Sequence, residues 1–224
     1  MTYRQAILLL KSLGTAQNRK VYARHGVGSK MYGVSFANLG RLTREIKKDH
    51  ALSQELWRSG NHDARVLATM VADPLEASRQ LIDAWKRDLD NYVITDAFSI
   101  FVAKTRFAQG RLERWTKSSQ EWTGRAGWLI FARLAMKDGV LADEYLEARI
   151  PVIEERIHKA KNRVRDAMNS ALIAIGARSA ALEEKAVAAA LRIGKVEVDH
   201  GRTGCKTPDA VTYIRKTRAR KKRR

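Results

Sequence analysis

The chain has 224 residues, enough to bury one sizeable core or one array of repeated units, and too few for two large independent globules. A formal net charge of +19 and a pI near 10.4 exceed what solubility needs and favour a polyanionic partner, either nucleic acid or an acidic membrane surface. No apolar run approaches the ~20 residues of a membrane span, so nucleic acid is favoured, and we expect one continuous body.

Apolar residues recur at helical spacing from residue 35 to residue 193, without the sustained alternation that is typical of half-buried strands. The sequence therefore predicts an all-α protein. Asn61, His62 and Asp63 form a capping cluster before one helix, and Pro74 separates that helix from the next. In chain order, the apolar stripes cover 36–46, 52–57, 66–71, 75–85, 92–102, 124–136, 144–157, 164–175 and 180–193.

Short polar turns join these stripes, and the repeating unit is a helix pair of roughly 35 to 40 residues. Stacked antiparallel pairs of the HEAT type would form a right-handed solenoid with a concave basic groove. An ordinary helical bundle is the alternative, because the candidate repeats share little sequence identity. We assign residues 1–194 to the helical array.

The pattern changes after Gly194. Residues 195–214 contain glycines and a proline, and we expect an irregular segment that packs on the helices and ends in a short turn near 212–214. Eight of the ten residues 215–224 are basic, which predicts a tail that is disordered when free. Without those eight charges, about +11 remains on the rest of the chain, so the body is basic in its own right.

Two short spacings place an aromatic residue beside a charged one on the same helix face. Tyr92 lies one turn before Asp96, and Trp122 lies three residues before Arg125. Asp96 lies among apolar neighbours, so its carboxylate is either buried with a partner or faces a cavity. Such pairs are also common in ordinary amphipathic helices, and that interpretation stays open.

Basic residues further along the chain are candidates for holding DNA phosphates on the concave surface. A solvated outer face is the alternative for about half of them. The candidates for the DNA backbone are Arg133, Lys161, Arg163 and Arg165, together with Arg125.

Asp199, His200 and Cys205 are residue types that bind zinc, but nothing nearby completes a set of four ligands. We therefore expect hydrogen-bonded loop residues and no metal. Thiol catalysis by Cys205 lacks an orienting partner that the sequence can identify. As the only cysteine, Cys205 cannot form an internal disulfide, so nothing indicates an oxidising compartment and we expect a cytoplasmic protein.

Two motifs carry a resemblance to a known family: Leu-Trp-x-x-x-x-His-Asp/Glu-x-Arg, and an aromatic residue followed four positions later by Asp. With these motifs, the chain resembles the AlkD-type DNA alkylation repair proteins, HEAT-like glycosylases that act on N-alkylated purines. The residues 198–210 look like a marker of one branch of that family. The resembling segments are 32–36, 56–68, 90–96, 122–126 and 198–210.

The resemblance implies a role for several residues. Asp96 matches the catalytic aspartate of the family, Tyr92 matches its aromatic residue one turn earlier, and Arg125 matches its phosphate-binding arginine, with Trp122 just before it. Two positions depart from the family pattern: Tyr92 and Ser170 stand where the family's enzymes carry tryptophan, so half of the aromatic cleft is missing. Trp128 is a candidate to replace it.

The first hypothesis is a monofunctional DNA glycosylase that hydrolyses the N-glycosidic bond of N3- or N7-alkylated purines in double-stranded DNA. It needs no cofactor, and we expect a monomer associated with the nucleoid. The second is a non-catalytic protein that binds damaged, bent or branched DNA. A protein-binding helical scaffold is a third, which suits the fold but not the charge.

Overall fold

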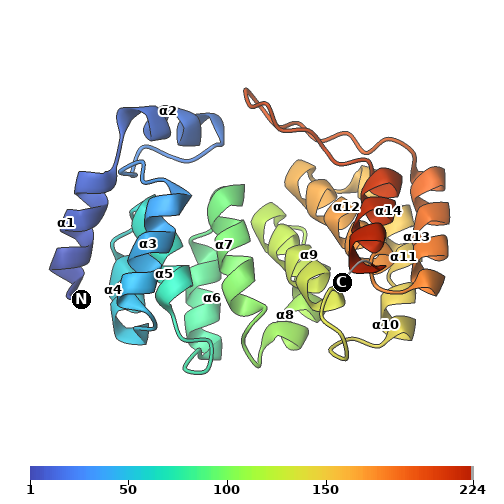
Figure 1. The fold of residues 1–224 in the computed structure, drawn as a ribbon, viewed down its shortest axis with the longest axis horizontal. Coiled ribbons are helices and arrows are strands. Elements are labelled where there is room, and N and C mark those ends of the chain that lie inside the picture. The colour runs from blue at the N-terminus through green and yellow to red at the C-terminus, as the bar shows by residue number, and fades with distance from the viewer. Residues whose placement is uncertain (223–224) are drawn as a thin grey trace. The chain divides into compact units, whose positions relative to one another are not determined.

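The structure is a computed structural model that describes residues 1–222. Within this range the chain is helical, with a single isolated bridge between Gly14 and Val34 and no strand, which confirms the all-α prediction (Figure 1). The chain divides into two compact units: the first contains residues 1–108 and 201–203, and the second contains residues 109–200 and the residues from 204 onward. This division differs from the one continuous body expected.

The first unit contains seven complete helices, most of which begin at a side chain that caps free backbone amides. Asn61 accepts a hydrogen bond from the Ala64 amide at 3.2 Å, as the predicted capping cluster requires, and Asn91 accepts one from Ile94 at 3.1 Å. The helices are α1 (Tyr3–Leu13), α2 (Ala16–Arg24), α3 (Phe36–Ile46), α4 (His50–Arg58), α5 (His62–Val71), α6 (Arg79–Arg87) and α7 (Tyr92–Val102).

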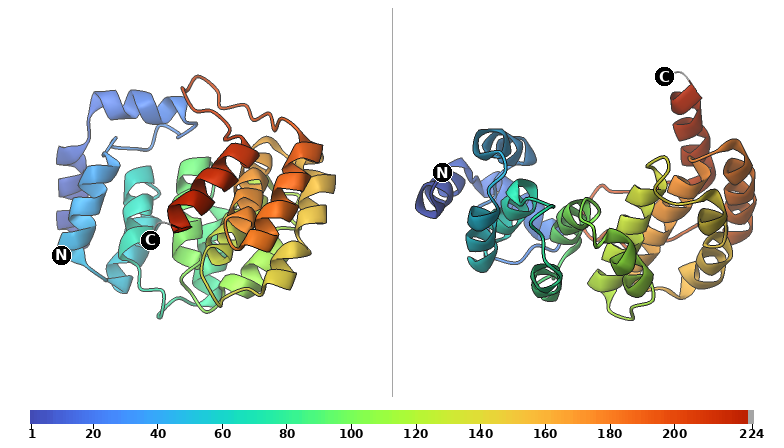
Figure 2. Two further views of the ribbon diagram at one scale, coloured as in Figure 1. Left: turned by 45° about the vertical axis from the view of Figure 1, so that its right-hand side comes forward. Right: turned by 90° about the horizontal axis from the view of Figure 1, so that it is seen from below.

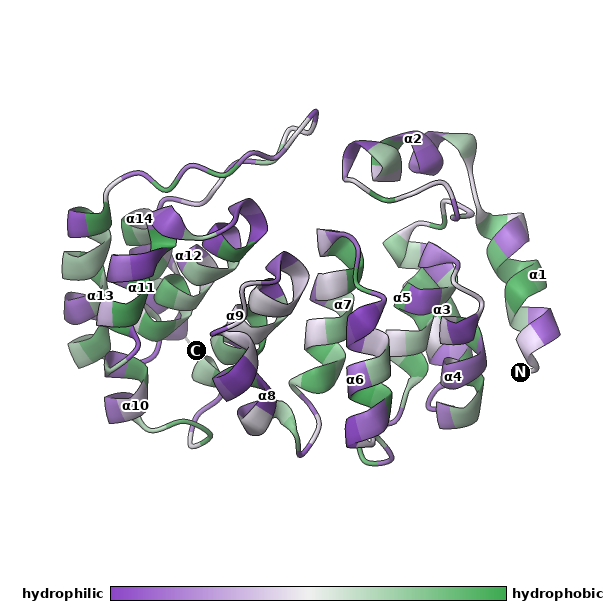
Figure 3. Cartoon of the chain, turned by 180° about the vertical axis from the view of Figure 1, so that it is seen from behind, coloured by the Kyte–Doolittle hydropathy of each residue, from purple (hydrophilic) through white to green (hydrophobic). Residues whose placement is uncertain are grey.

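Aromatic stacking joins α4 to α6. The Trp57 and Trp85 rings are parallel within 4°, with centroids 4.3 Å apart, and the Trp57 indole donates to Asp88 at 2.7 Å. Arg65 lies over the Trp57 ring and pairs with Asp88 at 3.1 Å. Hydrophilic and hydrophobic positions alternate around α6, which buries Ile82 and Trp85 (Figure 3). The tryptophan and arginine of the first family motif thus have structural roles.

Asp63, the acid of the same motif, organises the chain before α3. Its fully buried carboxylate accepts backbone N–H bonds from Tyr32 at 2.6 Å, Gly33 at 3.1 Å and Val34 at 2.8 Å. Three donors satisfy a buried charge that would otherwise be costly. These bonds fix the segment that leads into Phe36 and therefore the position of α3 beside α5.

The second unit is built around α9 and α12, which share the most extensive contact in the chain. The last helix, α14, lies against α12 and α13 (Figure 2). A Cβ on Gly176 would lie 2.8 Å from the side chain of Ile214, so only glycine permits this close approach. The helices are α9 (Glu121–Ala135), α10 (Asp143–Glu147), α11 (Ile150–Arg156), the 3-10 helix η1 (Ile157–Lys159), α12 (Asn162–Gly176), α13 (Ala180–Ile193) and α14 (Ala210–Lys222). Helix α8 (Ala108–Trp115) begins at the division between the units.

Two expectations about the C-terminal half differ from the structure. The stripe 144–157 is divided among α10, α11 and η1, because Pro151 lies at the start of α11 and has no amide hydrogen to continue the preceding helix. Residues 215–222, expected to be disordered, continue α14, and Arg218 pairs with Glu183 of α13 at 3.2 Å. The expected tail residues 223–224 lie outside the described residues. None of the described helices is long and apolar enough to cross a bilayer.

Candidate functional site

A cavity of about 650 Å³ opens on the first unit. Helices α2, α3, α5 and α7 supply its lining, and α7 contributes one face through residues spaced three or four apart. Asp96 and Tyr92 both line this cavity and are half-buried. The sequence predicted that Asp96 is either buried with a partner or faces a cavity, and the structure has Asp96 at a cavity.

Aromatic rings surround the cavity. Tyr22 packs edge-on against Phe36, with ring centroids 6.4 Å apart, and the Tyr92 ring packs edge-on against His25 at 5.7 Å. The Tyr92 hydroxyl is also hydrogen-bonded to His25 Nδ1. These contacts fix the rings of Tyr22 and Tyr92, whereas Phe36 remains 51% exposed at the opening.

Tyr22 is held in its neutral form. Burial, with a smaller contribution from the negative charge of Asp63, raises the pKa of Tyr22 to about 12. Its hydroxyl donates to the Val34 carbonyl at 2.5 Å. The ring therefore presents an uncharged aromatic surface to the cavity at physiological pH.

The composition of the cavity suits a flat, positively charged ligand. Aromatic faces attract cations through the ring quadrupole, and a nearby carboxylate adds a direct charge interaction. Asp96 is the acid among the cavity residues, and Lys104 is the lysine, at an exposed position just after α7. The same carboxylate can stabilise positive charge that develops during a reaction.

Arg125 belongs to the second unit and is buried, with 4% of its surface exposed. Its Nη1 atom donates to Asp166 at 2.7 Å and to the carbonyl of Arg163 at 2.9 Å. These contacts join α9 to the first turn of α12. A guanidinium in this environment does not offer the exposed surface that a phosphate requires, so the structure indicates a positioning role rather than the expected backbone contact.

The aromatic candidates on α9 differ from each other in exposure. Trp128 is 1% exposed and packs edge-on against Phe131 at 5.8 Å, so the expectation that it would replace a missing aromatic residue is wrong. Trp122, the second residue of α9, is half-buried. Ser170 is half-buried on α12, and its hydroxyl donates to the carbonyl of Asp166 at 3.1 Å.

The remaining basic candidates fall into two groups. Lys161 and Arg133 are exposed, as a phosphate contact requires. Arg165 donates to three backbone carbonyls, and Arg163 contacts His200 at 3.3 Å. Arg163 and Arg165 therefore hold the segment after α13 against α12, which is a structural role that their spacing did not indicate.

The residues Asp199 and His200 also have structural contacts. His200 is hydrogen-bonded to Thr207 at 3.0 Å, and the Asp199 backbone exchanges two hydrogen bonds with the Asn162 side chain. Among the described residues, no group of three or more His, Cys, Asp or Glu side chains is arranged to hold a metal ion. Cys205 is a free, exposed thiol.

Comparison with known proteins identifies the family of this chain. A family profile described as DNA alkylation repair enzyme matches residues 6–214. The chain belongs to this family. The uncharacterized protein Lin0241 of Listeria innocua is 30% identical over 98% of this chain and 99% of that protein. The uncharacterized protein Lmo0209 of Listeria monocytogenes is 29% identical over 99% of this chain and its own full length.

The fold is similar to that of a solved structure. It is described as a new family of proteins related to the HEAT-like repeat DNA glycosylases with affinity for branched DNA structures. It matches with a TM-score of 0.90 and 26% identity, covering 99% of this chain and 95% of that one. The HEAT-like fold inferred from helix spacing and from the family motifs is thereby confirmed.

The sequence identified two of the residues that line the cavity on this DNA alkylation repair enzyme fold, Tyr92 and Asp96. It missed Tyr22 and His25, because the helical pattern was followed only from residue 35, and it assigned Phe36 to an apolar stripe without linking it to Asp96. One signal was available: Tyr22 and His25 lie three residues apart, after Thr15, whose side chain caps α2.

Proposed function

We propose that this protein is a DNA repair glycosylase that hydrolyses the N-glycosidic bond of N3- or N7-alkylated purines in double-stranded DNA. The observation that carries the proposal is the position of Asp96 in a cavity with three aromatic side chains, Tyr22, Phe36 and Tyr92. Alkylation at N3 or N7 makes the purine cationic, and that is the ligand the cavity suits. Membership of the DNA alkylation repair enzyme family supports the same substrate class.

In the proposed reaction, the bond between the sugar C1′ and the purine nitrogen breaks, and the bonding electrons leave with the base. The departing alkylpurine becomes neutral, while the sugar takes the positive charge. The Asp96 carboxylate stabilises that charge and orients a water molecule, whose oxygen bonds to C1′ and whose proton is released. The aromatic rings contact the base by cation–π interaction before the bond breaks.

The experiment is base release from duplex DNA methylated at guanine N7. Asp96→Asn is expected to reduce the release of free 7-methylguanine by at least about a hundredfold, because one electrostatic contact in a transition state contributes that much. Its affinity for the same duplex without methylation should stay within a factor of two. Glu76→Gln removes an exposed carboxylate from the same unit, outside the cavity, and serves as the matched control. Equal release by wild type and Asp96→Asn would refute the assignment.

The second candidate is non-catalytic binding of branched DNA. Its support is the affinity for branched DNA described for the protein of the solved structure, together with the burial of Arg125 and the serine at position 170. This function predicts tighter binding to a four-way junction than to a linear duplex of equal length, unchanged by Asp96→Asn. Junction preference without any base release would favour this candidate over the first.

Under either candidate function, the protein binds double-stranded DNA and needs no cofactor. We also propose that it is a cytoplasmic monomer. The net charge of +19 supports attraction to the phosphate backbone, and the exposed Lys161 and Arg133 are the residues we assign to it. On this proposal Arg125 acts through α12, which it holds in position, and Trp122 supplies an aromatic face.

A further inference from the structure

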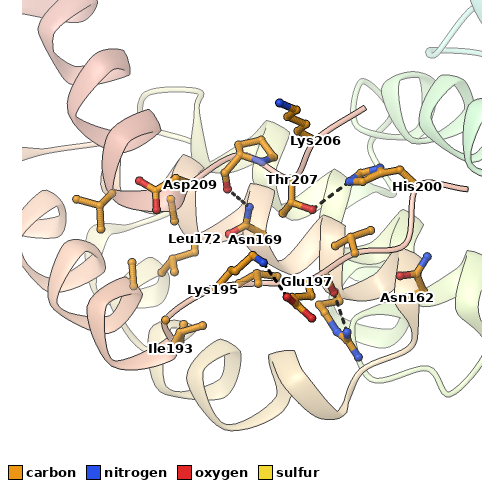
Figure 4. Close-up of a pocket in the computed structure, with 18 of the residues that line it drawn as sticks. Asn162, Asn169, Leu172, Ile193, Lys195, Glu197, His200, Lys206, Thr207 and Asp209 are labelled. Carbon is orange, nitrogen blue, oxygen red and sulfur yellow. Dashed lines mark hydrogen bonds and ion pairs between the residues drawn. The ribbon is translucent and has the colours of Figure 1, made fainter. Parts of the chain in front are cut away.

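A cavity of about 1010 Å³ in the second unit has no part in the proposed reaction (Figure 4). One face of α12 forms one wall, and the end of α13 forms another. The irregular residues 195–200 and 205–209 pass over it and lead into α14. This volume is at the upper end of the range for ligand sites and has room for one nucleotide.

Asn169 contributes an unsatisfied polar atom to this cavity. Its side chain is 1% exposed, and its amide nitrogen donates to the carbonyl of Pro208 at 2.9 Å (Figure 4). The Oδ1 atom is buried and has no hydrogen-bond partner within the described part of the chain. A buried acceptor without a donor is costly, so a group that supplies an N–H or O–H would bind favourably here.

Arg165, one turn earlier on the same face of α12, contributes an unsatisfied donor. Its terminal nitrogens donate to the carbonyls of Glu197, His158 and Ala160, at 2.8, 3.1 and 3.1 Å. These bonds leave Nε, which is also buried without a partner. Asn169 and Arg165 therefore lie one turn apart on α12 and carry an unsatisfied acceptor and an unsatisfied donor, which complement a ligand with an N–H beside an acceptor.

The surroundings of this pair are apolar on the walls and charged at the edge. Leu172 and Ile193 line the cavity (Figure 4). Leu191 also lines it and is 68% exposed. Lys206 is an exposed cation beside the opening. Apolar walls suit the faces of a flat ring, and the exposed lysine suits a phosphate attached to it.

We propose that this cavity binds one unpaired nucleobase of DNA. Every base carries an N–H donor beside an acceptor on its pairing edge, and that edge is free only when the base has no partner strand. The site therefore distinguishes unpaired from paired nucleotides with little preference among the four bases. The inference rests on the DNA binding proposed above and adds a second contact, independent of Asp96.

Cys205 makes the proposal testable, because the only thiol of the protein lines this cavity and is exposed. The measurement is the rate at which a maleimide modifies Cys205 in the full-length protein. One reaction contains a duplex with a single bulged thymidine, and the other contains the same duplex with a tetrahydrofuran abasic residue at the bulge. The thymidine bulge is expected to slow modification about tenfold more than the abasic bulge at equal DNA concentration.

Two variants and one control test whether the protection of Cys205 depends on this cavity. Asn169→Leu removes the acceptor at similar volume, and Leu191→Trp blocks the opening from an exposed position where the fold tolerates change. Both should reduce protection by the thymidine bulge to the abasic level. Leu75→Trp, at an 87% exposed leucine of the first unit, should behave as wild type.

Equal protection by the two duplexes, or full protection of Leu191→Trp, would overturn the nucleobase site and leave the proposed repair activity intact. Loss of base release in Asp96→Asn with unchanged Cys205 protection would support two separate sites. A protein that binds neither duplex would refute both this inference and the proposed function.

Discussion

At the scale of single residues, the assignment depends on Asp96 and on the side chains that define its surroundings. Tyr92 was expected from its spacing to Asp96, and the structure places both along one cavity. The contact between His25 and Tyr92 could not be expected, because it joins residues 67 positions apart. Patterns within one helix are readable from sequence, whereas contacts between distant helices depend on how those helices pack.

Tyr22 should make the stability of the fold depend on pH. Its pKa of about 12 in the folded protein lies above the value near 10 of an unfolded chain, so the folded state holds the proton more tightly. The resulting stabilisation is fully present below pH 10 and is lost as the pH rises toward 12. Tyr22→Phe should lower the free energy of unfolding by about 1 kcal/mol at pH 8, by loss of the hydrogen bond to Val34.

Urea unfolding at pH 8, 10 and 11 measures this effect. Between pH 10 and pH 11, Tyr22→Phe should lose less stability than wild type, because the titrating group is absent. Tyr213→Phe, at a tyrosine that is 46% exposed, is the control and should follow the wild-type curve. An alkaline decline of the same size in Tyr22→Phe would show that this phenol is not responsible.

At the scale of helices, the apolar stripes located α7 and α13 with the bounds observed, and they located α9 and α12 to within three residues. The sequence did not predict α1, α2 or α8. Helix α6 begins at Arg79 rather than at residue 75, and Leu75 is 87% exposed, so the stripe included a leucine that has no place in the core. Spacing identifies an apolar face, but only packing decides whether that face is covered.

The buried ion pair between Arg125 and Asp166 joins two helices, and breaking it should destabilise the fold. Because Arg125 is buried, its replacement by glutamine leaves the Asp166 carboxylate without its partner and should cost about 3 kcal/mol of unfolding free energy. The double variant Arg125→Met with Asp166→Leu should cost less than Arg125→Gln alone, because it leaves no unpaired charge.

Denaturation of these variants in urea provides the measurement. Lys185→Gln breaks the exposed pair with Glu147, where both side chains are 48% accessible, and should change stability by less than about 1 kcal/mol. If Arg125→Gln were as stable as wild type yet bound DNA poorly, Arg125 would be a phosphate contact and its positioning role would be wrong.

At the scale of the whole molecule, the charge of +19 predicted a polyanionic partner, and membership of the DNA alkylation repair enzyme family agrees with that prediction. The sequence did not indicate that the chain divides into two units, because helical spacing continues on both sides of residue 108. It also treated 215–222 as a tail, because α14 is held by contacts such as that of the buried Ile214 with Gly176, which joins residues far apart in the sequence.

The positive charge of the protein should make its affinity for DNA depend on salt concentration. The logarithm of the DNA association constant should fall linearly with the logarithm of salt concentration, and Lys161→Gln should reduce the slope by about 0.9 if that exposed lysine neutralises one phosphate. Lys185→Gln, whose ammonium is paired with Glu147, should leave the slope unchanged. A wild-type slope near zero would contradict phosphate binding altogether.

The most direct test of the account is whether the cavity at Asp96 recognises a cationic base. The measurement is the affinity for a duplex with one N7-methylguanine on a 2′-fluorinated sugar, which resists bond cleavage, relative to the same duplex with guanine. Wild type should bind the cationic base at least about tenfold more tightly, and Asp96→Asn should lose that preference. Equal affinity of wild type for the two duplexes would contradict the central claim.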